Sequence, residues 1–438
     1  MATRLTPSAS RLPSLGRLES LGLRNVKLGL EAIDAVCQRL GRPERQILSV
    51  LVAGTNGKGS TAATLASIGT AAGLATGLYT SPHLIEVTER IRIGPDDIPA
   101  GELDATLAEV FAAADAASVV PLTYFEAMTA AAFLCFAGRR LDLAVLEVGL
   151  GGRLDATNVA PASISLVTSI SLDHMADLGG TLASIAREKA GVFRSGRPAL
   201  VRADSSEARQ ALERAARAVG CRLHDASEEL RFADEETDLE GSRFRLETPR
   251  KAYALATPLP GEHQMRNAAL AVRAAELLAE DGVRIDAGSI AAGVAAVRWP
   301  GRLERFRIRG KTILLDGCHN PEGAAALARF LGRSGVRGAL VFGAMADKDI
   351  EEIGRVLFPR IGRVCFVAFS GGRAATPEEL ARRLGGLAPG AATAGTLEGA
   401  VRKFLGDAQT ETIIIAGSLY LVGEARALLL SGRLDESP

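Results

Sequence analysis

The chain has 438 residues, which is enough for two or three folded domains. Its 51 Lys and Arg residues balance 51 Asp and Glu residues, so the chain lacks the net charge that binders of nucleic acid or anionic membranes depend on. We therefore expect neither a nucleic acid nor a membrane as a partner. Hydrophobic residues make up 47% of the chain and charged residues 23%, which excludes a disordered or fibrous protein.

The cysteines indicate a reducing compartment. They are odd in number, widely spaced and form no C-x-x-C motif, which argues against a secreted disulfide framework and favours the cytoplasm. No stretch approaches the roughly 20 apolar residues that cross a bilayer, and the N-terminus lacks the pattern of a secretory signal. Residues 1–18 carry Ser and Arg but no acid, and we expect a short mobile tail there.

The first two thirds of the chain predict one α/β domain. Short apolar runs alternate with helical patterns, which is typical of a mostly parallel sheet covered by helices on both faces. The expected buried strands are 47–53, 75–79, 141–148, 164–170 and 199–202. Residues 227–257 alternate polar and apolar positions around Glu240-Gly241, which predicts an antiparallel hairpin or small added sheet. Helices are expected at 265–281 and 286–297.

A second domain is predicted to begin at Trp299-Pro300-Gly301, where proline and glycine stop the preceding helix. About four to five strands then alternate with helices in an open α/β, Rossmann-like sheet; those we can name are 311–315, 338–342, 364–369 and 412–416. The predicted domains are therefore 1–298 and 299–438. A cleft between two such domains commonly holds a small molecule.

A glycine-rich loop follows the first strand, with the sequence GTNGKGST at residues 54–61, and runs into an Ala-rich helix. Glycines let backbone N–H groups converge on phosphate oxygens, the helix N-terminus adds a favourable dipole, and Lys58 adds charge. The spacing departs from the standard phosphate loop, which would need glycine at Val52. A simple connecting turn is the structural alternative, but lysine between glycines after a buried strand favours nucleotide binding in a P-loop-type ATPase domain.

Glu147 ends a buried strand, at the edge of the sheet where ligands bind in this class of fold. We interpret it as the acid that holds the magnesium ion of a nucleotide. A buried carboxylate paired with an arginine such as Arg153 is the structural alternative. The segment 149–153 offers backbone amides and a guanidinium near the phosphates, and His174 closes the next strand.

Ordered motifs extend from about Leu21 to Arg426. They are VAGTNGKGST (52–61), TSPHL (80–84), ERIRIG (89–94), LTYFEAMT (122–129), EVGLGGRLDATN (147–158), DH (173–174), TLASIAREKAG (181–191), GEHQMRNAALA (261–271), WPGR (299–302), LDGCHNP (315–321), DKD (347–349) and GSLY (417–420). In this order they resemble the folylpolyglutamate synthase and dihydrofolate synthase family, a branch of the Mur-type ATP-dependent amide-forming ligases.

The resemblance implies a definite reaction. ATP would phosphorylate a pterin-linked carboxylate, and the amine of L-glutamate would attack the acyl phosphate to leave an amide. Magnesium, as one or two ions, and lysine would stabilise the charge that gathers on the transferred phosphoryl group. The implied substrates are dihydropteroate, reduced folates and L-glutamate, and we expect a monomer.

The same resemblance implies roles for individual residues. The nucleotide would contact Asn56, Gly57, Lys58, Gly59, Ser60, Asn267, Arg302 and Asp316. Magnesium would be held by Ser81, Glu147 and His174. The catalytic groups would be Lys58, His319 and Lys189, and Lys189 matches a lysine that the family carboxylates to a carbamate. The pterin would lie near Thr123, Tyr124, Phe125, Glu126, Arg153, Leu154 and Asp155, while His319 and Ser418 would position glutamate.

Several alternatives stay open. Tyr124 and Phe125 head an apolar helix and could serve the core, and Lys189 could form a surface ion pair with Glu188. The alternative functions are a monofunctional folylpolyglutamate synthase, a Mur-type cell-wall peptide ligase and a nucleotide-dependent binding switch. The segment LTYFE at 122–126 favours the dihydropteroate activity, because it resembles the pterin site of bifunctional bacterial members.

Overall fold

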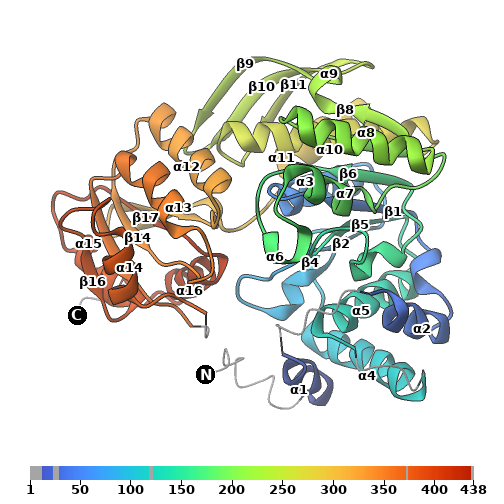
Figure 1. The fold of residues 1–438 in the computed structure, drawn as a ribbon, viewed down its shortest axis with the longest axis horizontal. Coiled ribbons are helices and arrows are strands. Elements are labelled where there is room, and N and C mark those ends of the chain that lie inside the picture. Colours follow the sequence, from blue (N-terminus) through green and yellow to red (C-terminus); the bar gives the residue numbers. More distant parts are fainter. Residues whose placement is uncertain (1–11, 23–28, 118–121, 371–372, 436–438) are drawn as a thin grey trace.

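Three β-sheets organise the molecule, whose computed structural model describes residues 12–22, 29–117, 122–370 and 373–435 (Figure 1). The largest sheet has the strand order β4-β3-β2-β5-β1-β6-β7-β8, and the strands from β2 to β8 in this order run parallel. Their bounds are β1 (Ser49–Ala53), β2 (Thr76–Tyr79), β3 (Ile91–Ile93), β4 (Asp96–Asp97), β5 (Leu143–Glu147), β6 (Ile164–Val167), β7 (Pro198–Val201) and β8 (Arg222–Asp225). The predicted parallel sheet is confirmed, although β3, β4 and β8 were not expected.

Helices cover both faces of this sheet because its central strands are apolar on both sides. In β1, Val50 and Val52 face one core cluster, while Leu51 and Ala53 face the other. The first cluster is covered by α3 (Lys58–Ala71), α10 (Glu262–Glu280) and α11 (Ala287–Ala296). The second is covered by α2 (Glu31–Arg39), α4 (Ala100–Ala117), α5 (Tyr124–Gly138), α7 (Leu182–Ala190) and α8 (Ser206–Val219). Such burial on both faces explains the continuous apolar runs of these strands.

The expected mobile tail over residues 1–18 is wrong for its last part. Helix α1 (Pro13–Ser20) begins with a proline at its first position and buries Leu15 and Leu18, which lie three residues apart on one helix face. The helix packs on α4, and the Leu15 amide donates a hydrogen bond of 2.8 Å to the Asp104 carboxylate. Residues 1–11 lie outside the described residues.

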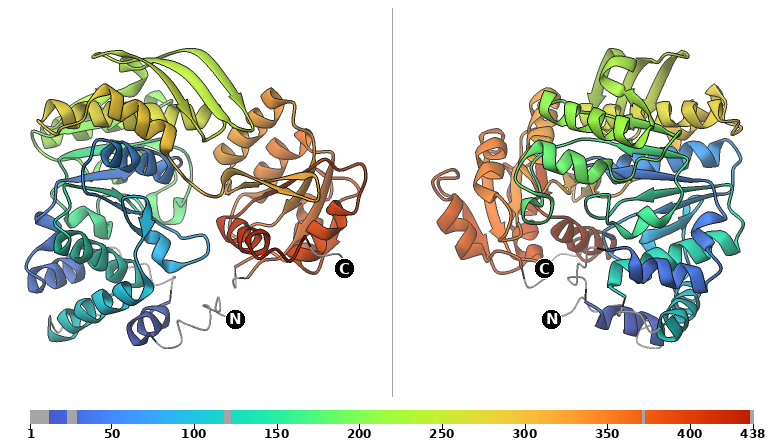
Figure 2. Two further views of the ribbon diagram at one scale, coloured as in Figure 1. Left: turned by 180° about the vertical axis from the view of Figure 1, so that it is seen from behind. Right: turned by 45° about the vertical axis from the view of Figure 1, so that its right-hand side comes forward.

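The added β element is a three-stranded antiparallel sheet of β9 (Arg231–Asp238), β10 (Gly241–Glu247) and β11 (Ala252–Thr257). Its apolar face turns Phe244, Leu246 and Leu255 toward the same core as α10. This confirms the hairpin predicted around residues 240–241. Figure 2 shows the sheet standing above the large sheet and extending to the C-terminal part of the chain, where β9 contacts α12 (Pro321–Ser334).

The third sheet forms the C-terminal domain, by which we mean the chain from residue 299; the N-terminal domain is the part before it. The strand order is β12-β13-β17-β14-β15-β16. The strands are β12 (Arg302–Ile308), β13 (Lys311–Asp316), β14 (Ala339–Phe342), β15 (Arg363–Val367), β16 (Ala392–Ala394) and β17 (Thr412–Ala416). Helices α12, α13 (Ile350–Leu357) and α14 (Pro377–Leu384) cover one face, and α15 (Leu397–Leu405) and α16 (Leu419–Leu430) cover the other.

The sequence did not predict β12 or β16 because neither is an apolar run. β12 carries three arginines and a glutamate and pairs antiparallel with β13 at the edge of the sheet, while β16 has only three residues. The predicted boundary at residue 299 falls in the connection between α11 and β12. Among the described residues no helix is both long and apolar enough to span a membrane.

Helix α11 approaches α3 so closely that a side chain is excluded at Gly293. A Cβ at Gly293 would lie 2.3 Å from the Cα of Ile68, whereas a Cβ at Gly288 on the same helix would lie 3.4 Å from the nearest atom, in Asp286. We expect Gly293→Ala to lower the free energy of unfolding by about 1 to 3 kcal/mol. Gly288→Ala should raise it by up to about 1 kcal/mol through helix propensity. Chemical denaturation of both variants checks this, and equal effects would contradict the close packing.

Candidate active site

The glycine-rich loop connects β1 to α3 and is fixed against the turn after β6. The Thr55 amide donates to the Ser169 carbonyl at 2.9 Å, the Asn56 amide donates to Ser169 Oγ at 3.0 Å, and the Thr168 hydroxyl donates to the Asn56 carbonyl at 2.6 Å. No side chain of the described residues caps α3, so the N–H groups of its first turn remain available. This is the geometry of an anion site at a helix N-terminus.

Two residues from distant parts of the chain close in on this loop. Gly57 precedes α3 with a φ of +83°, and a Cβ there would lie 2.3 Å from Asn267 Oδ1 on α10. A Cβ at Gly59 would lie 2.5 Å from the ring of Trp299. The loop therefore needs glycine at both positions, and the structure brings the predicted nucleotide contacts Asn56, Gly57, Gly59 and Asn267 together.

Two lysine ammonium groups converge on one backbone oxygen. Lys58 Nζ donates to the carbonyls of Gly54 at 3.0 Å and Thr55 at 3.1 Å, and Lys189 Nζ donates to the same Gly54 carbonyl at 2.8 Å. Within the described residues, both ammonium groups thus donate to backbone carbonyls and not to carboxylates. Burial, together with the charge of Lys58, lowers the pKa of Lys189 to about 7. The site is thus short of negative charge, as expected of a pocket that takes a polyanion.

Glu147 lies at the carboxyl end of β5 and is only 5% exposed. Burial raises its pKa, while Lys58 and the hydrogen bond from the Ser81 amide, at 3.1 Å, act in the opposite direction. Ser81 follows β2, the neighbour of β5, so the sheet itself brings these two predicted metal ligands together. The alternative pairing of Glu147 with Arg153 is wrong, because Arg153 forms its ion pair with Glu188 at 3.0 Å.

His174 follows β6 at the same edge of the sheet and precedes the short helix α6 (Met175–Leu178). Its side chain is half exposed, and burial of the ring, together with Lys348, lowers its pKa. Nothing in the described residues forms a cluster of three or more His, Cys, Asp or Glu side chains that could hold a metal. Magnesium commonly binds one or two carboxylates plus substrate phosphates. Glu147 and Ser81 therefore suit an ion that arrives with its nucleotide.

The C-terminal domain contributes Arg302 and Asp316, which face each other in register on β12 and β13. Burial lowers the pKa of Arg302 and raises that of Asp316, and each charge counteracts the shift of the other. The Asp316 carboxylate accepts hydrogen bonds from the amides of Leu303 at 3.1 Å and Cys318 at 3.0 Å. Arg302 donates to the Gly301 carbonyl at 3.0 Å. Asp316 thus secures the strand end that carries Arg302, which lines a pocket together with Thr80 and Leu419.

Two carboxylates that the sequence analysis assigned to the pterin site, those of Glu126 and Asp155, form hydrogen bonds within the protein. Glu126 Oε2 accepts from the Thr123 amide at 2.8 Å and hydroxyl at 2.7 Å, which caps α5. Asp155 accepts from the amides of Gly149 and Leu150 at 3.0 and 2.9 Å, and from Thr157. Both acids therefore have a structural function in shaping their loops, which sequence patterns alone did not separate from ligand binding.

The two aromatic residues at the head of α5 differ in environment. Tyr124 is 7% exposed and lies 5.1 Å below the guanidinium of Arg90, as part of the core. The ring of Phe125 is partly exposed and approaches the Gly149 backbone so closely that a Cβ there would lie 2.7 Å from the ring. Since Gly149 follows Glu147 by two residues, Phe125 lies beside the proposed metal site. Leu154 is partly buried next to Asp155.

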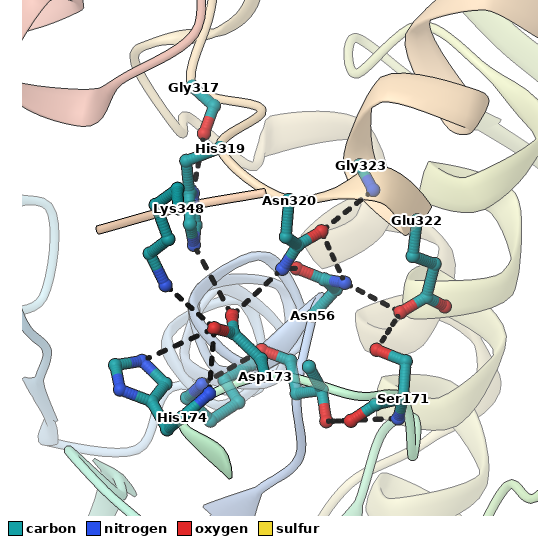
Figure 3. Close-up of polar contacts among 12 residues, drawn as sticks. Asn56, Ser171, Asp173, His174, Gly317, His319, Asn320, Glu322, Gly323 and Lys348 are labelled. Carbon is teal, nitrogen blue, oxygen red and sulfur yellow. Dashed lines mark hydrogen bonds and ion pairs between the residues drawn. The ribbon is translucent and has the colours of Figure 1, made fainter. Parts of the chain in front are cut away.

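His319 and its polar contacts are shown in Figure 3. His319 Nδ1 donates to the Gly317 carbonyl at 2.9 Å, and burial lowers the pKa of His319 to about 4. The ring is therefore neutral at pH 7, with a free lone pair on Nε2, which lies 4.0 Å from the Asp173 carboxylate. Ser418 is 2% exposed and caps α16 by accepting from the Tyr420 amide.

Asp173 and Lys348 are functional candidates to which the sequence assigned no role. Lys348 Nζ lies 2.6 Å from Asp173 Oδ1. Burial raises the pKa of Asp173, but hydrogen bonds from Lys348 and Asn320 outweigh it and hold that pKa well below its usual range. Both residues stand in motifs, DH and DKD, that follow strands of different sheets. That position was the only signal that could have identified them.

Family models match most of the chain. The model of the Mur ligase middle domain covers residues 52–275, and that of the Mur ligase glutamate ligase domain covers residues 301–419. The fold and the site thus define a Mur-type ligase, an ATP-dependent class of enzyme.

Similar proteins identify the family within the Mur-type ligases to which this chain belongs. The chain is 35% identical to the dihydrofolate synthase/folylpolyglutamate synthase of Escherichia coli, covering 98% of each chain. It is 37% identical to a probable bifunctional folylpolyglutamate synthase/dihydropteroate synthase of Haloferax volcanii, of which it spans about half, 48%. The chain belongs to the dihydrofolate synthase/folylpolyglutamate synthase family, and the expected resemblance is confirmed.

Two solved structures agree with this assignment. The Escherichia coli FolC complex with DHPP and ADP matches with a TM-score of 0.86 and 33% identity, covering 98% of this chain and 99% of that one. A bifunctional folylpolyglutamate synthase/dihydrofolate synthase with Mn, AMPPNP and L-glutamate bound matches with a TM-score of 0.83 and 33% identity, covering 95% and 98%. The predicted fold class is confirmed, and the nucleotide and the divalent metal fit the family.

The lowered pKa of Lys189 predicts a pH-dependent stability. An unfolded lysine keeps its proton up to about pH 10, whereas folded Lys189 loses it near pH 7, so the unfolded chain binds more protons and stability rises with pH between these values. Relative to Lys189→Met, the wild-type chain should gain about 2 kcal/mol of unfolding free energy from pH 7 to pH 9. Denaturation in buffer free of carbon dioxide measures this. A difference that stays constant with pH would contradict the assigned environment.

Proposed function

We propose that this chain joins L-glutamate to dihydropteroate and to reduced folates, using ATP and an acyl-phosphate intermediate. The carrying observation is the pair of ammonium groups on the Gly54 carbonyl, next to an uncapped helix N-terminus and the buried Glu147. The names of the Escherichia coli relative and of the structures with DHPP, AMPPNP and L-glutamate support the substrates.

In this proposal the phosphates of ATP lie on the amides of residues 57–60, with Lys58 turned from the loop carbonyls to the terminal phosphate. Glu147, Ser81 and His174 hold the magnesium ion, which supplies charge neutralisation during phosphoryl transfer. Asn267 orders the loop from behind. Arg302, supported by Asp316, reaches the nucleotide from the C-terminal domain.

The organic substrates would occupy the cleft on either side of the terminal phosphate. We assign the pterin ring to the exposed side of Phe125, because an aromatic face stacks on a flat heterocycle. Tyr124, Thr123, Glu126, Leu154 and Asp155 shape that surface from behind, and Arg153 lies at its rim. His319 Nε2, unprotonated at neutral pH, would accept a hydrogen bond from the amino group of L-glutamate and orient it, and Ser418 would help to hold that substrate.

Lys189 is proposed to carry a carbamate. With a pKa of about 7, its amine is about half unprotonated in neutral solution, and the unprotonated amine is the form that adds carbon dioxide. The reaction forms an N–C bond, leaves a carboxylate on Nζ and releases one proton. It replaces one of two crowded positive charges at Gly54 with a negative one that can face the metal.

The carbamate predicts chemical rescue. Lys189→Ala should reduce turnover at least about tenfold, and a short carboxylic acid such as acetate should restore part of it. Lys403→Ala, on the exposed face of α15, serves as the control and should keep wild-type turnover with or without acetate. Steady-state phosphate release measures both. An unaltered rate in Lys189→Ala would contradict the proposal.

The substrates are tested by a coupled assay of phosphate release, with dihydropteroate and tetrahydrofolate offered separately, each with and without L-glutamate. We expect release that requires both organic substrates, and Lys58→Ala should lower turnover by ~3 to 4 kcal/mol of transition-state stabilisation. Activity with tetrahydrofolate alone would indicate a monofunctional folylpolyglutamate synthase. Release indifferent to either substrate would indicate a nucleotide switch and contradict the proposal.

We also infer a monomer in the cytoplasm that needs no nucleic acid or membrane. The balanced charge and five cysteines that are all free thiols support this. Light scattering of the purified chain measures its mass in solution.

A further inference from the structure

One carboxylate of the N-terminal domain, that of Asp173, is held by side chains of the C-terminal domain (Figure 3). Lys348 Nζ lies 2.6 Å from its Oδ1, and Asn320 Nδ2 donates to its Oδ2 at 3.0 Å. His319 Nε2 lies 4.0 Å from the same Oδ2. The Asp173 side chain is 9% exposed and that of Lys348 is 18% exposed, so the pair is largely withdrawn from solvent.

The four residues come from equivalent places in the two sheets. Asp173 follows β6 in the large sheet; His319 and Asn320 follow β13, and Lys348 follows β14, in the C-terminal sheet. In open α/β sheets, ligands bind at the carboxyl ends of the strands. Asp173 therefore marks the point at which the ligand-binding edges of the two domains meet.

The contact continues directly into the phosphate loop. Asn320 and Asn56 exchange a pair of amide hydrogen bonds, of 3.0 and 3.2 Å. Asn320 Oδ1 also accepts from the Gly323 amide at 2.9 Å as the cap of α12, so both ends of the Asn320 amide are in use. Glu322 accepts from Asn56 Nδ2 at 2.6 Å and from the Ser171 hydroxyl at 2.7 Å. Because these hydrogen bonds connect the start of α12 to Asn56, any shift of α12 away from Asp173 would displace the phosphate loop.

Another ion pair between the two domains has a longer distance and is more exposed to solvent. Arg333 on α12 lies 3.4 Å from Glu262 on α10, and the two side chains are 56% and 31% exposed. Exposed pairs of this kind contribute little, whereas removing one partner of a buried, hydrogen-bonded charge pair carries a large cost. The pair of Asp173 and Lys348 is thus the stronger of these two links.

We propose that Asp173 and Lys348 are positioning residues whose ion pair holds the C-terminal domain over the phosphate loop. The pair sets where His319 stands relative to the nucleotide phosphates, so it acts on the reacting groups through domain placement. This assignment deepens the proposed function and rests on it for its kinetic consequence. The amides of residues 57–60 that take the phosphates lie in the N-terminal domain, whereas His319 lies in the C-terminal domain. Loss of the pair should therefore lower kcat far more than it raises the KM for ATP.

The experiment compares Lys348→Met with Arg333→Met in the full chain. We expect Lys348→Met to lower kcat by roughly 10- to 100-fold, with the KM for ATP within about twofold of wild type. Without ligands its radius of gyration, from small-angle X-ray scattering, should exceed that of wild type. Arg333→Met should match wild type in both measurements. Lys348→Arg keeps the charge and should retain more than about a tenth of wild-type kcat and the wild-type radius.

Each contrary outcome overturns the assignment. Wild-type kcat in Lys348→Met, or a rise in KM alone, would show that Lys348 does not act through domain placement. If Lys348→Arg, which keeps the positive charge, is as slow as Lys348→Met, the ion pair is not what supports turnover. Lys348→Arg also provides the test if circular dichroism shows that Lys348→Met does not fold. The scattering comparison needs no turnover. A wild-type chain without ligase activity would therefore defeat the proposed function, while an unchanged radius in Lys348→Met would defeat the positioning role.

Discussion

The crowding of two ammonium groups at the Gly54 carbonyl is the constraint on which the site depends. Buried cations normally have a carboxylate partner, because removing a charge from water is costly. Within the part of the chain that the structure describes, Lys58 and Lys189 have only backbone oxygens as hydrogen-bond acceptors, and the pKa of Lys189 falls to about 7. In that part of the chain, the positive charges of these two lysines are thus not balanced by a hydrogen-bonded carboxylate. A polyphosphate with its magnesium ion, or a carbamate on Lys189, would supply the missing negative charge.

The rest of the molecule can be understood as support for this arrangement. Strand order in the large sheet brings Ser81 and Glu147 beside the loop, and the turn after β6 fixes the loop backbone through Ser169. The C-terminal sheet presents its own carboxyl edge to the same place. Because Asn56 and Asp173 both accept hydrogen bonds from Asn320 of the C-terminal domain, the position of that domain and the shape of the phosphate loop are coupled.

Patterns that depend on local chemistry could be predicted from the sequence. Buried parallel strands are apolar runs, so the sequence predicted β1, β5 and β17. The glycines and the lysine of residues 54–61 likewise predicted the phosphate loop. Edge strand β12 was not predicted because its charged residues interrupt the apolar pattern by which the other strands were recognised. The capping function of Glu126 and the internal bonds of Asp155 could not be separated from ligand binding, since both functions need a carboxylate. The pairing of Asp173 with Lys348, 175 residues apart, is set by tertiary structure alone.

The most direct measurement is a crystal structure of the chain with magnesium and a non-hydrolysable ATP analogue. The account predicts that the triphosphate lies on the amides at the start of α3, with Lys58 Nζ released from the carbonyls of Gly54 and Thr55 and bonded to the terminal phosphate. A triphosphate bound elsewhere, with Lys58 still on those carbonyls, would contradict it.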